Sequence, residues 1–223
     1  MLEPEDLHHL VRVLRLRDGE VVSVTDGAGE WRLCHLENGG ELAVAGEIFS
    51  EPPPVPTVTI GFAIPKGDRP EWIVQKLTEI GVDRIILLHA GHSVVRWEPS
   101  RAAKNLERLT KVAREAAMQS RRVRRVELVG PLLIDDVIGG VPSGDDQVSM
   151  PNPVCGAEPD GGPIDLGRPT ILIGPEGGWT TGELAQFGAT VSLGPTILRV
   201  ETAAMVAAAR LVELRERSRQ RPQ

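Results

Sequence analysis

Before residue 57, the apolar positions of the chain fall in short runs separated by turn residues. This pattern is typical of β structure, and it predicts short strands over 21–25, 31–36 and 42–48. Asp26-Gly27-Ala28-Gly29 supplies the turn chemistry of a hairpin between the first two strands. Ahead of them, apolar residues at three- and four-residue steps predict a helix over 6–16. Residues 1–50 are therefore expected to form a small β domain.

A proline-rich segment, Glu51-Pro52-Pro53-Pro54-Val55-Pro56, separates this part from the rest. It cannot continue a helix or a central strand, so we place a domain boundary there. From residue 57 to 223, unbroken apolar runs alternate with helical periodicity. Buried strands are expected over 58–64, 85–89, 170–173 and 191–193. Helices are expected over 68–81, 100–120, 181–187 and 201–217. Such alternation implies an α/β domain with a largely parallel sheet, whose ligand lies beyond the carboxyl ends of the strands.

One stretch of the second part, residues 139–168, is rich in Pro, Gly and Asp and has little periodicity. We expect a long loop or a partly ordered insertion there.

Composition narrows the class of protein. With 41% hydrophobic and 3% aromatic residues, the core must be built from Val, Ile, Leu and Ala. No run approaches the roughly 18 apolar residues of a membrane span, and the N-terminus has no basic-then-apolar signal segment. We therefore expect a cytoplasmic protein without a membrane partner. The two cysteines, Cys34 and Cys155, suggest neither a disulfide framework nor a metal site.

The net charge of −6 hides an uneven distribution. Residues 66–125 carry 14 basic and 7 acidic side chains, whereas residues 127–198 carry 1 basic and 10 acidic ones. A basic block of this density suits contact with a phosphate backbone, and it is equally typical of a solvated helix face. Composition alone leaves both interpretations open.

A glycine-rich loop, Gly174-Pro175-Glu176-Gly177-Gly178, follows the strand expected at 170–173. Its glycines allow a ligand to approach the backbone closely. A phosphate is disfavoured, because no Gly-Lys-Ser/Thr follows and Glu176 would repel an anion. A neutral or cationic ligand such as S-adenosylmethionine fits better. A tight turn without a ligand is the alternative.

A second loop runs from Leu193 to Ala203 and also follows an expected strand. It places Arg199 and Glu201 two residues apart where a helix begins, and a helix N-terminus offers unpaired N–H groups. A simple ion pair with a helix cap is the alternative.

Together the two loops resemble the SPOUT class of methyltransferases, and more closely the RsmE family of 16S rRNA uridine-N3 methyltransferases. The matching motifs are Ile173-Gly174-Pro175-Glu176-Gly177-Gly178-Trp179 and Ser192-Leu193-Gly194-Pro195 with Ile197-Leu198-Arg199 and Glu201-Thr202-Ala203. Further agreement comes from His9-Leu10, Val13-Leu14-Arg15, Asp26-Gly27, Lys66-Gly67, Glu71-Trp72, Gln75-Lys76, Glu79, Gly81-Val82 and Glu115-Ala116-Ala117 with Gln119-Ser120. The family's strand carrying a His-Glu or similar dipeptide is least clear, and Cys155-Gly156-Ala157-Glu158 is its nearest counterpart. Thr196 stands where Arg is common in the family.

The resemblance implies a PUA-like β-barrel domain followed by a SPOUT-type α/β domain with a C-terminal trefoil knot, working as a homodimer. It implies S-adenosylmethionine as cofactor and 16S rRNA, in an assembled or nearly assembled small subunit, as partner. By this likeness the cofactor is held by Leu172, Ile173, Gly174, Pro175, Glu176, Gly177, Gly178, Leu193, Gly194, Pro195, Ile197, Leu198, Thr202 and Ala203.

For the chemistry, we expect Arg199 to stabilise negative charge on a uracil oxygen, with Glu201 or Glu176 orienting the base or accepting its proton. RNA contacts are expected from Arg12, Arg15, Arg17, Lys66, Arg69, Arg101, Lys104, Arg108, Arg121 and Arg122. Three other functions compete: a non-catalytic RNA-binding protein, a nucleotide- or phosphate-binding enzyme, and a SPOUT methyltransferase with another RNA target. Neither of the first two explains both loops.

Overall fold

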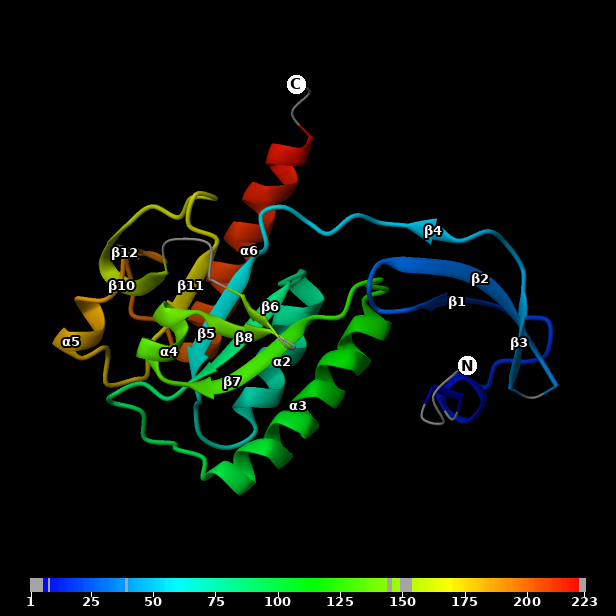
Figure 1. Ribbon diagram of the computed structural model, residues 1–223, viewed down its shortest axis with the longest axis horizontal. Coiled ribbons are helices and arrows are strands. Elements are labelled where there is room, and N and C mark those ends of the chain that lie inside the picture. Colours follow the sequence, from blue (N-terminus) through cyan, green and yellow to red (C-terminus); the bar gives the residue numbers. More distant parts are fainter. Residues whose placement is uncertain (1–5, 8, 39, 144–145, 149–153, 221–223) are drawn as a thin grey trace. The chain divides into compact units, whose positions relative to one another are not determined.

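The computed structural model describes residues 6–7, 9–38, 40–143, 146–148 and 154–220. The chain divides into two compact units, residues 1–53 and 54–223 (Figure 1).

The first unit is built around an antiparallel sheet. Its strands β1 (Val21–Thr25), β2 (Glu30–Glu37) and β3 (Glu41–Val44) lie in that order, and β4 (Phe49–Ser50) also pairs with β2. The expected hairpin is present, and the Asp26 carboxylate accepts hydrogen bonds from the backbone N–H groups of Ala28 and Glu30 at 2.6 and 3.0 Å. The helix expected over 6–16 is represented by a π-helical segment, η1 (His9–Val13). The strand expected over 42–48 ends earlier, at Val44.

The second unit contains a six-stranded sheet with the order β12-β10-β11-β5-β6-β7. All of its neighbouring strands are parallel, which confirms the prediction of a parallel sheet. The strands are β5 (Thr59–Ala63), β6 (Arg84–Leu88), β7 (Glu127–Leu132), β10 (Cys155–Gly162), β11 (Thr170–Ile173) and β12 (Ala189–Val191). A separate antiparallel hairpin pairs β8 (Val141–Ser143) with β9 (Asp146–Val148).

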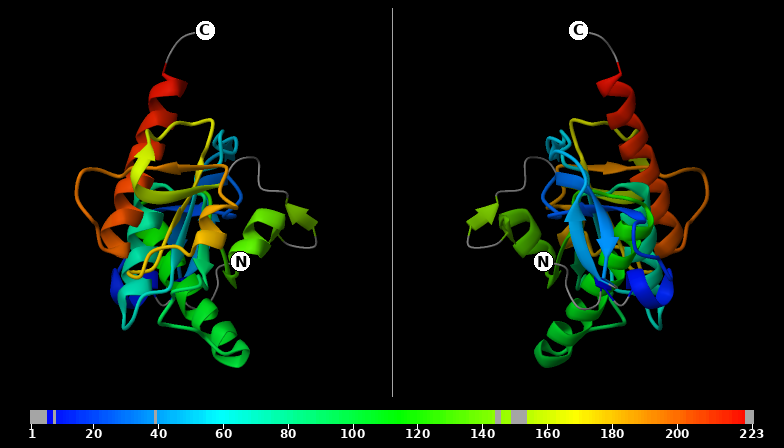
Figure 2. Two further views of the ribbon diagram at one scale, coloured as in Figure 1. Left: turned by 90° about the vertical axis from the view of Figure 1, so that its left-hand side faces the viewer. Right: turned by 90° about the vertical axis from the view of Figure 1, so that its right-hand side faces the viewer.

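Helices cover both faces of this sheet (Figure 2). One face packs against α2 (Arg69–Ile80), α3 (Pro99–Gln119) and α6 (Val200–Arg219). The other packs against α4 (Ile134–Gly139) and the region of α5 (Thr181–Leu184), where Trp179 and Phe187 are buried. Strands that are buried on both faces have continuous apolar sequences. The apolar runs in the sequence therefore predicted most strands of this sheet.

The prediction for residues 139–168 was partly wrong. Residues 144–145 and 149–153 lie outside the described residues, but 155–162 form β10, an inner strand of the sheet. Only Cys155 and Gly156 pair with β11, and the glycines and the proline of this strand give neither an apolar run nor a regular alternation. Strand β7 and helix α4 were also not anticipated.

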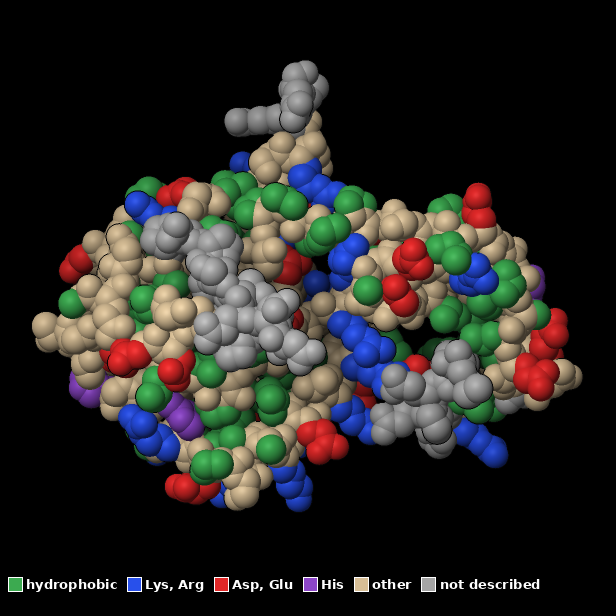
Figure 3. All heavy atoms as spheres, viewed as in Figure 1, with side chains coloured by type: hydrophobic (Ala, Val, Ile, Leu, Met, Phe, Trp, Pro, Cys, Tyr) green, Lys and Arg blue, Asp and Glu red, His purple; other side chains and the backbone are tan. Residues whose placement is uncertain are grey.

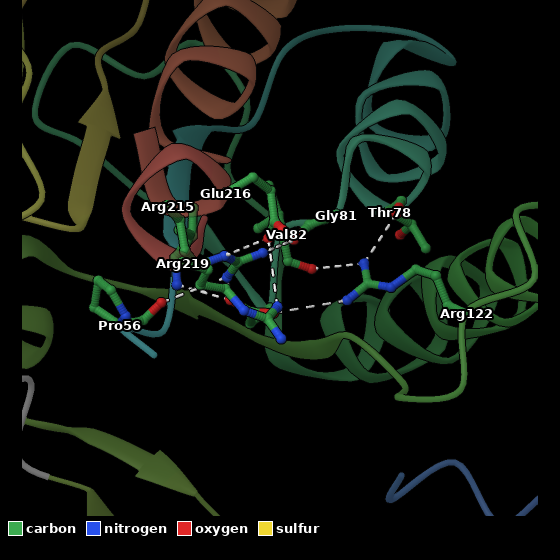
Figure 4. Close-up of polar contacts among 10 residues, drawn as sticks. Pro56, Thr78, Gly81, Val82, Arg122, Arg215, Glu216 and Arg219 are labelled. Carbon is green, nitrogen blue, oxygen red and sulfur yellow. Dashed lines mark hydrogen bonds and ion pairs between the residues drawn. The ribbon is translucent and has the colours of Figure 1, made fainter. Parts of the chain in front are cut away.

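A cluster of buried charges lies where β5 and β6 begin (Figure 4). The Asp83 carboxylate accepts a 2.8 Å hydrogen bond from the Val58 N–H and forms ion pairs with Arg215 of α6 and with Arg122. Arg122 also donates to the carbonyl oxygens of Thr78 and Val82 at 2.9 and 2.7 Å. Burial lowers the pKa of Arg122, and the nearby Arg215 adds to this effect, while Asp83 opposes it. The cluster ties α6 and the end of α3 to the amino edge of the sheet.

Candidate active site

The two loops singled out from the sequence leave the same edge of the sheet. Strand β10 lies between β11 and β12, with Cys155 opposite Ile171 on one side and opposite Ala189 on the other. Because parallel strands in register end together, the loops that follow β11 and β12 emerge side by side, flanking β10. The sequence prediction of one ligand site at the carboxyl ends requires this arrangement.

The first loop, Gly174–Gly178, is closely packed at two of its glycines, where an added side chain would make its neighbours move. A Cβ atom at Gly174 would lie 2.9 Å from the Trp179 ring, and one at Gly177 would lie 3.1 Å from the Cβ of His92. Gly178 has φ +72°, a left-handed conformation that favours glycine. Gly177 is exposed and Gly174 and Gly178 are half-buried, so part of the backbone of this loop is accessible at the carboxyl edge of β11.

Two side chains that the sequence analysis did not single out hold this loop. His92 Nδ1 lies 3.1 Å from the carbonyl oxygens of both Gly177 and Gly178. Since a carbonyl only accepts hydrogen bonds, Nδ1 carries the proton and donates it. Just beyond the loop, the buried Glu183 accepts hydrogen bonds from the N–H groups of Gly91 and Thr180 at 2.7 and 2.8 Å. The Thr180-x-x-Glu183 spacing is a capping box, which the sequence could have revealed.

The second loop, Ser192–Arg199, begins beside β10, where the Ser192 N–H donates to the Gly162 carbonyl at 2.8 Å. Gly194 has φ +141°. Ile197 is 92% exposed. Arg199 is the N-cap of α6, and its exposed side chain has no ion-pair or hydrogen-bond partner in the described part of the chain. It is thus free to meet a substrate.

Arg69 links the first loop to the start of α6. It is the first residue of α2, and its Nη1 lies 3.5 Å from Glu176 Oε1 in the first loop and 3.7 Å from Glu201 Oε2 in the first turn of α6. Two of the three residues expected to carry the chemistry, Glu176 and Glu201, are thereby brought together with Arg69, which was expected to contact RNA. Glu176 is 54% exposed, whereas the Glu201 side chain is 15% exposed.

The residues present fit a cationic ligand. The Oε2 atom of Glu201 is buried and has no hydrogen-bond partner within the described residues, and Arg69 Nη1 faces it at 3.7 Å. A buried carboxylate oxygen in this state attracts a donor or a positive charge. S-adenosylmethionine carries two positively charged groups of this kind, a sulfonium and an ammonium. No group of His, Cys, Asp and Glu side chains suited to a metal ion occurs among the described residues.

The other residues predicted to bind the cofactor lie around the same edge. Leu172 and Ile173 are buried in β11, where their backbones pair with Gly61 and Phe62 of β5. The remaining ones lie in the two loops or in the first turn of α6: Pro175, Leu193, Pro195, Leu198, Thr202 and Ala203.

The basic residues predicted to contact RNA fall into different environments. Arg12, Arg15 and Arg17 are exposed in the first unit. In the second unit, Lys66, Arg101, Lys104 and Arg121 are exposed, and Arg108 forms an ion pair with Glu71. Arg122 differs, because its guanidinium is committed to Asp83 and two backbone carbonyls. Figure 3 shows acidic and basic side chains interspersed on the visible face of both units.

Two family models match the chain. One describes an RNA methyltransferase domain and matches residues 51–212, and the other describes an RNA methyltransferase PUA domain and matches residues 2–49. The chain is also similar in sequence to curated relatives named ribosomal RNA small subunit methyltransferase E, over most of their length. The relative from Bacillus subtilis is 34% identical over 91% of this chain and 85% of its own, and that from Mycobacterium bovis is 33% identical over 93% and 83%.

The fold is also similar to those of solved methyltransferase structures. The enzyme of that name from Neisseria gonorrhoeae, bound to S-adenosylmethionine, superimposes with a TM-score of 0.75 at 27% identity and covers 95% of this chain and 90% of its own. A putative methyltransferase from Legionella pneumophila, also in complex with this cofactor, has a TM-score of 0.77 at 25% identity over 94% and 89%. Among the described residues, no helix has the length and apolar character needed to cross a membrane.

Proposed function

Because the chain belongs to the family of ribosomal RNA small subunit methyltransferase E, we propose that it methylates N3 of one uridine in 16S rRNA. S-adenosylmethionine is its cofactor. The observation that carries this proposal is the meeting of Glu176, Glu201 and both loops at one edge of the parallel sheet.

The cofactor supplies an electrophilic methyl group on a positively charged sulfur. The backbone of Gly174–Gly178 and that of Leu193–Leu198 hold it, and Thr202 and Ala203 close the pocket. Two features of the chain support this assignment. Gly177 is exposed and Gly174 and Gly178 are half-buried, and the buried Glu201 oxygen has no hydrogen-bond partner among the described residues, with Arg69 Nη1 3.7 Å away.

A uridine N3 bears a proton at neutral pH and sits on the pairing edge of the base. The chain must therefore expose that edge, take the proton and align the nitrogen. Positioning of this kind lowers a barrier by roughly 7–11 kcal/mol in favourable cases, and a general base adds about 10²–10⁴-fold. Arg199 stabilises the negative charge that develops on a uracil oxygen, and Glu201 or Glu176 accepts the proton. The exposure of Arg199 and its freedom from partners among the described residues support its role.

RNA is held by exposed basic side chains of both units: Arg12, Arg15, Arg17, Lys66, Arg101, Lys104 and Arg121. Arg108 contributes where its pairing with Glu71 allows. We do not assign Arg122 to RNA, because Asp83 and two carbonyls engage its guanidinium. If phosphate contacts dominate, RNA affinity will fall steeply with salt concentration.

The remaining parts of the proposal rest on family likeness. The protein acts as a homodimer in the cytoplasm, on an assembled or nearly assembled small subunit, and its C-terminal segment forms a trefoil knot. A dimer would cover apolar side chains such as Ile197, which is 92% exposed. Sedimentation of the purified protein tests the dimer, and comparison of naked 16S rRNA with 30S subunits as substrate tests the assembly state.

Two experiments test the function. Mass spectrometry of 16S rRNA from cells with and without this protein should show one methylated uridine that disappears with the gene. In vitro, Arg199→Ala should bind S-adenosylmethionine with unchanged affinity in calorimetry and methylate at least about 10²-fold more slowly. Arg168→Ala, at an exposed position paired with Asp165, is the matched control. Near-normal turnover of Arg199→Ala would remove Arg199 from the chemistry.

A further inference from the structure

The position and contacts of Arg69 suggest a role other than binding RNA phosphates. It follows the loop after β5, and β5 pairs with β11, so the residue stands next to the glycine-rich loop. Its Nε donates a 3.0 Å hydrogen bond to the Lys66 carbonyl, which fixes the guanidinium. The Nη1 atom then faces Glu176 and Glu201 at once.

One cation therefore lies between two carboxylates, one in the glycine-rich loop and one in the first turn of α6. Both oxygen atoms lie within 3.7 Å of Nη1, so Arg69 offsets the repulsion between like charges at the mouth of the site. The ion pair with Arg69 compensates the charge of Glu201, whose Oε2 atom has no hydrogen-bond partner within the described residues. An RNA phosphate at the same guanidinium would meet Glu176, whose side chain is 54% exposed.

We propose that Arg69 is a positioning residue for methyl transfer: it holds Glu176 and Glu201 in a fixed relation so that a carboxylate faces the uridine N3–H. This inference rests on the proposed function and specifies how the site is assembled. It replaces the role in RNA binding that the sequence analysis gave to Arg69.

The test compares Arg69→Gln, Arg69→Lys, Glu201→Gln and the double variant Arg69→Gln/Glu201→Gln with the wild-type protein. Arg168→Gln, which removes an exposed arginine paired with Asp165, is the matched control. Three quantities are measured: the Kd of S-adenosylmethionine by calorimetry, the Kd of 16S rRNA over a range of salt concentrations, and the single-turnover methylation rate with both ligands saturating.

We expect Arg69→Gln to slow the single-turnover step by about 10–100-fold, since small misplacements of reacting groups have effects of this size. The Kd of RNA and its dependence on salt should match those of the wild-type protein. Arg69→Lys should restore most of the rate, and the double variant should be no slower than the slower single variant, because the two residues act through one contact.

Two outcomes would contradict a positioning role for Arg69. A single-turnover rate of Arg69→Gln within twofold of wild type, with weaker RNA binding and a salt slope reduced by about one, would assign Arg69 to a phosphate and overturn the inference. Independent, additive effects of the two single variants would also overturn it. If Arg69→Gln does not fold, Arg69→Lys and Glu201→Gln carry the comparison. Wild-type protein without methylation or cofactor binding would instead refute the proposed function itself.

Discussion

Replacing Asp83 with Asn tests how much the buried charge cluster stabilises the second unit. The Asp83 carboxylate balances two guanidinium groups, and the side chains of Asp83, Arg122 and Arg215 are only 14, 15 and 5% exposed. Removing one partner of a buried ion pair costs about 3–5 kcal/mol, because the remaining charge is left uncompensated. For a unit of this size, each 1 kcal/mol lowers Tm by about 2–4 °C. We therefore expect Asp83→Asn to lower Tm by about 6–20 °C.

Thermal unfolding followed by far-UV circular dichroism measures this change. Arg215→Met should cost less than Asp83→Asn, because Asp83 then keeps its pairing with Arg122. Arg217→Gln is the control, since it removes an ion pair to Glu213 in which both side chains are exposed and which contributes at most about 1 kcal/mol. If Asp83→Asn lowers Tm no more than Arg217→Gln does, the cluster does not stabilise the fold as argued.

Two further predictions concern the surroundings of the site. Burial lowers the pKa of His89, with a smaller contribution from Arg96, and His89 Nε2 accepts a hydrogen bond from the Trp97 N–H. As pH falls below about 6.5, His89 therefore takes up a proton more readily in the unfolded chain than in the folded one. The contribution of His89 to the free energy of unfolding should be fully present above that pH and should decrease below it. His89→Gln should flatten the dependence of Tm on pH between 5 and 7; an unchanged slope would contradict this. Gly174→Ala should lower Tm by about 2–12 °C and weaken cofactor binding, because the added methyl group displaces the Trp179 ring at a typical cost of about 1–3 kcal/mol. Calorimetry with unchanged affinity and an unchanged Tm would refute it.

The parts of the fold that the sequence predicted well begin and end at residues with a strong local preference for a helix start, a helix end or a strand. Helix α2 is an example, because Asp68 at its N-cap and Pro70 in its first turn mark the start, and Gly81, with φ +105°, marks the end. Strand β11 was found with its exact bounds, since all four of its residues are buried and three of them are apolar. These signals lie within a few residues of the element that they define.

Strand β10 and the Arg69 contacts could not be predicted in this way. β10 contains Gly156 and Pro159, and it is held in the sheet by neighbours on both sides rather than by its own propensity. Arg69 and Glu176 are 107 positions apart, and only the assembled sheet brings them together. The sequence indicated that Glu176 follows a strand and that Glu201 lies where a helix begins, yet the cation between them required the three-dimensional arrangement.

The pairing of β11 with β5 has a consequence for protein synthesis. Thr170 lies opposite Thr59, so the strand that leads into the glycine-rich loop depends on a partner made far earlier. Non-local pairings of this kind form late, after a long loop has closed. A nascent chain that ends before β11 lacks the glycine-rich loop that we propose holds the methyl donor, so the ribosome must nearly finish this protein before that site can form.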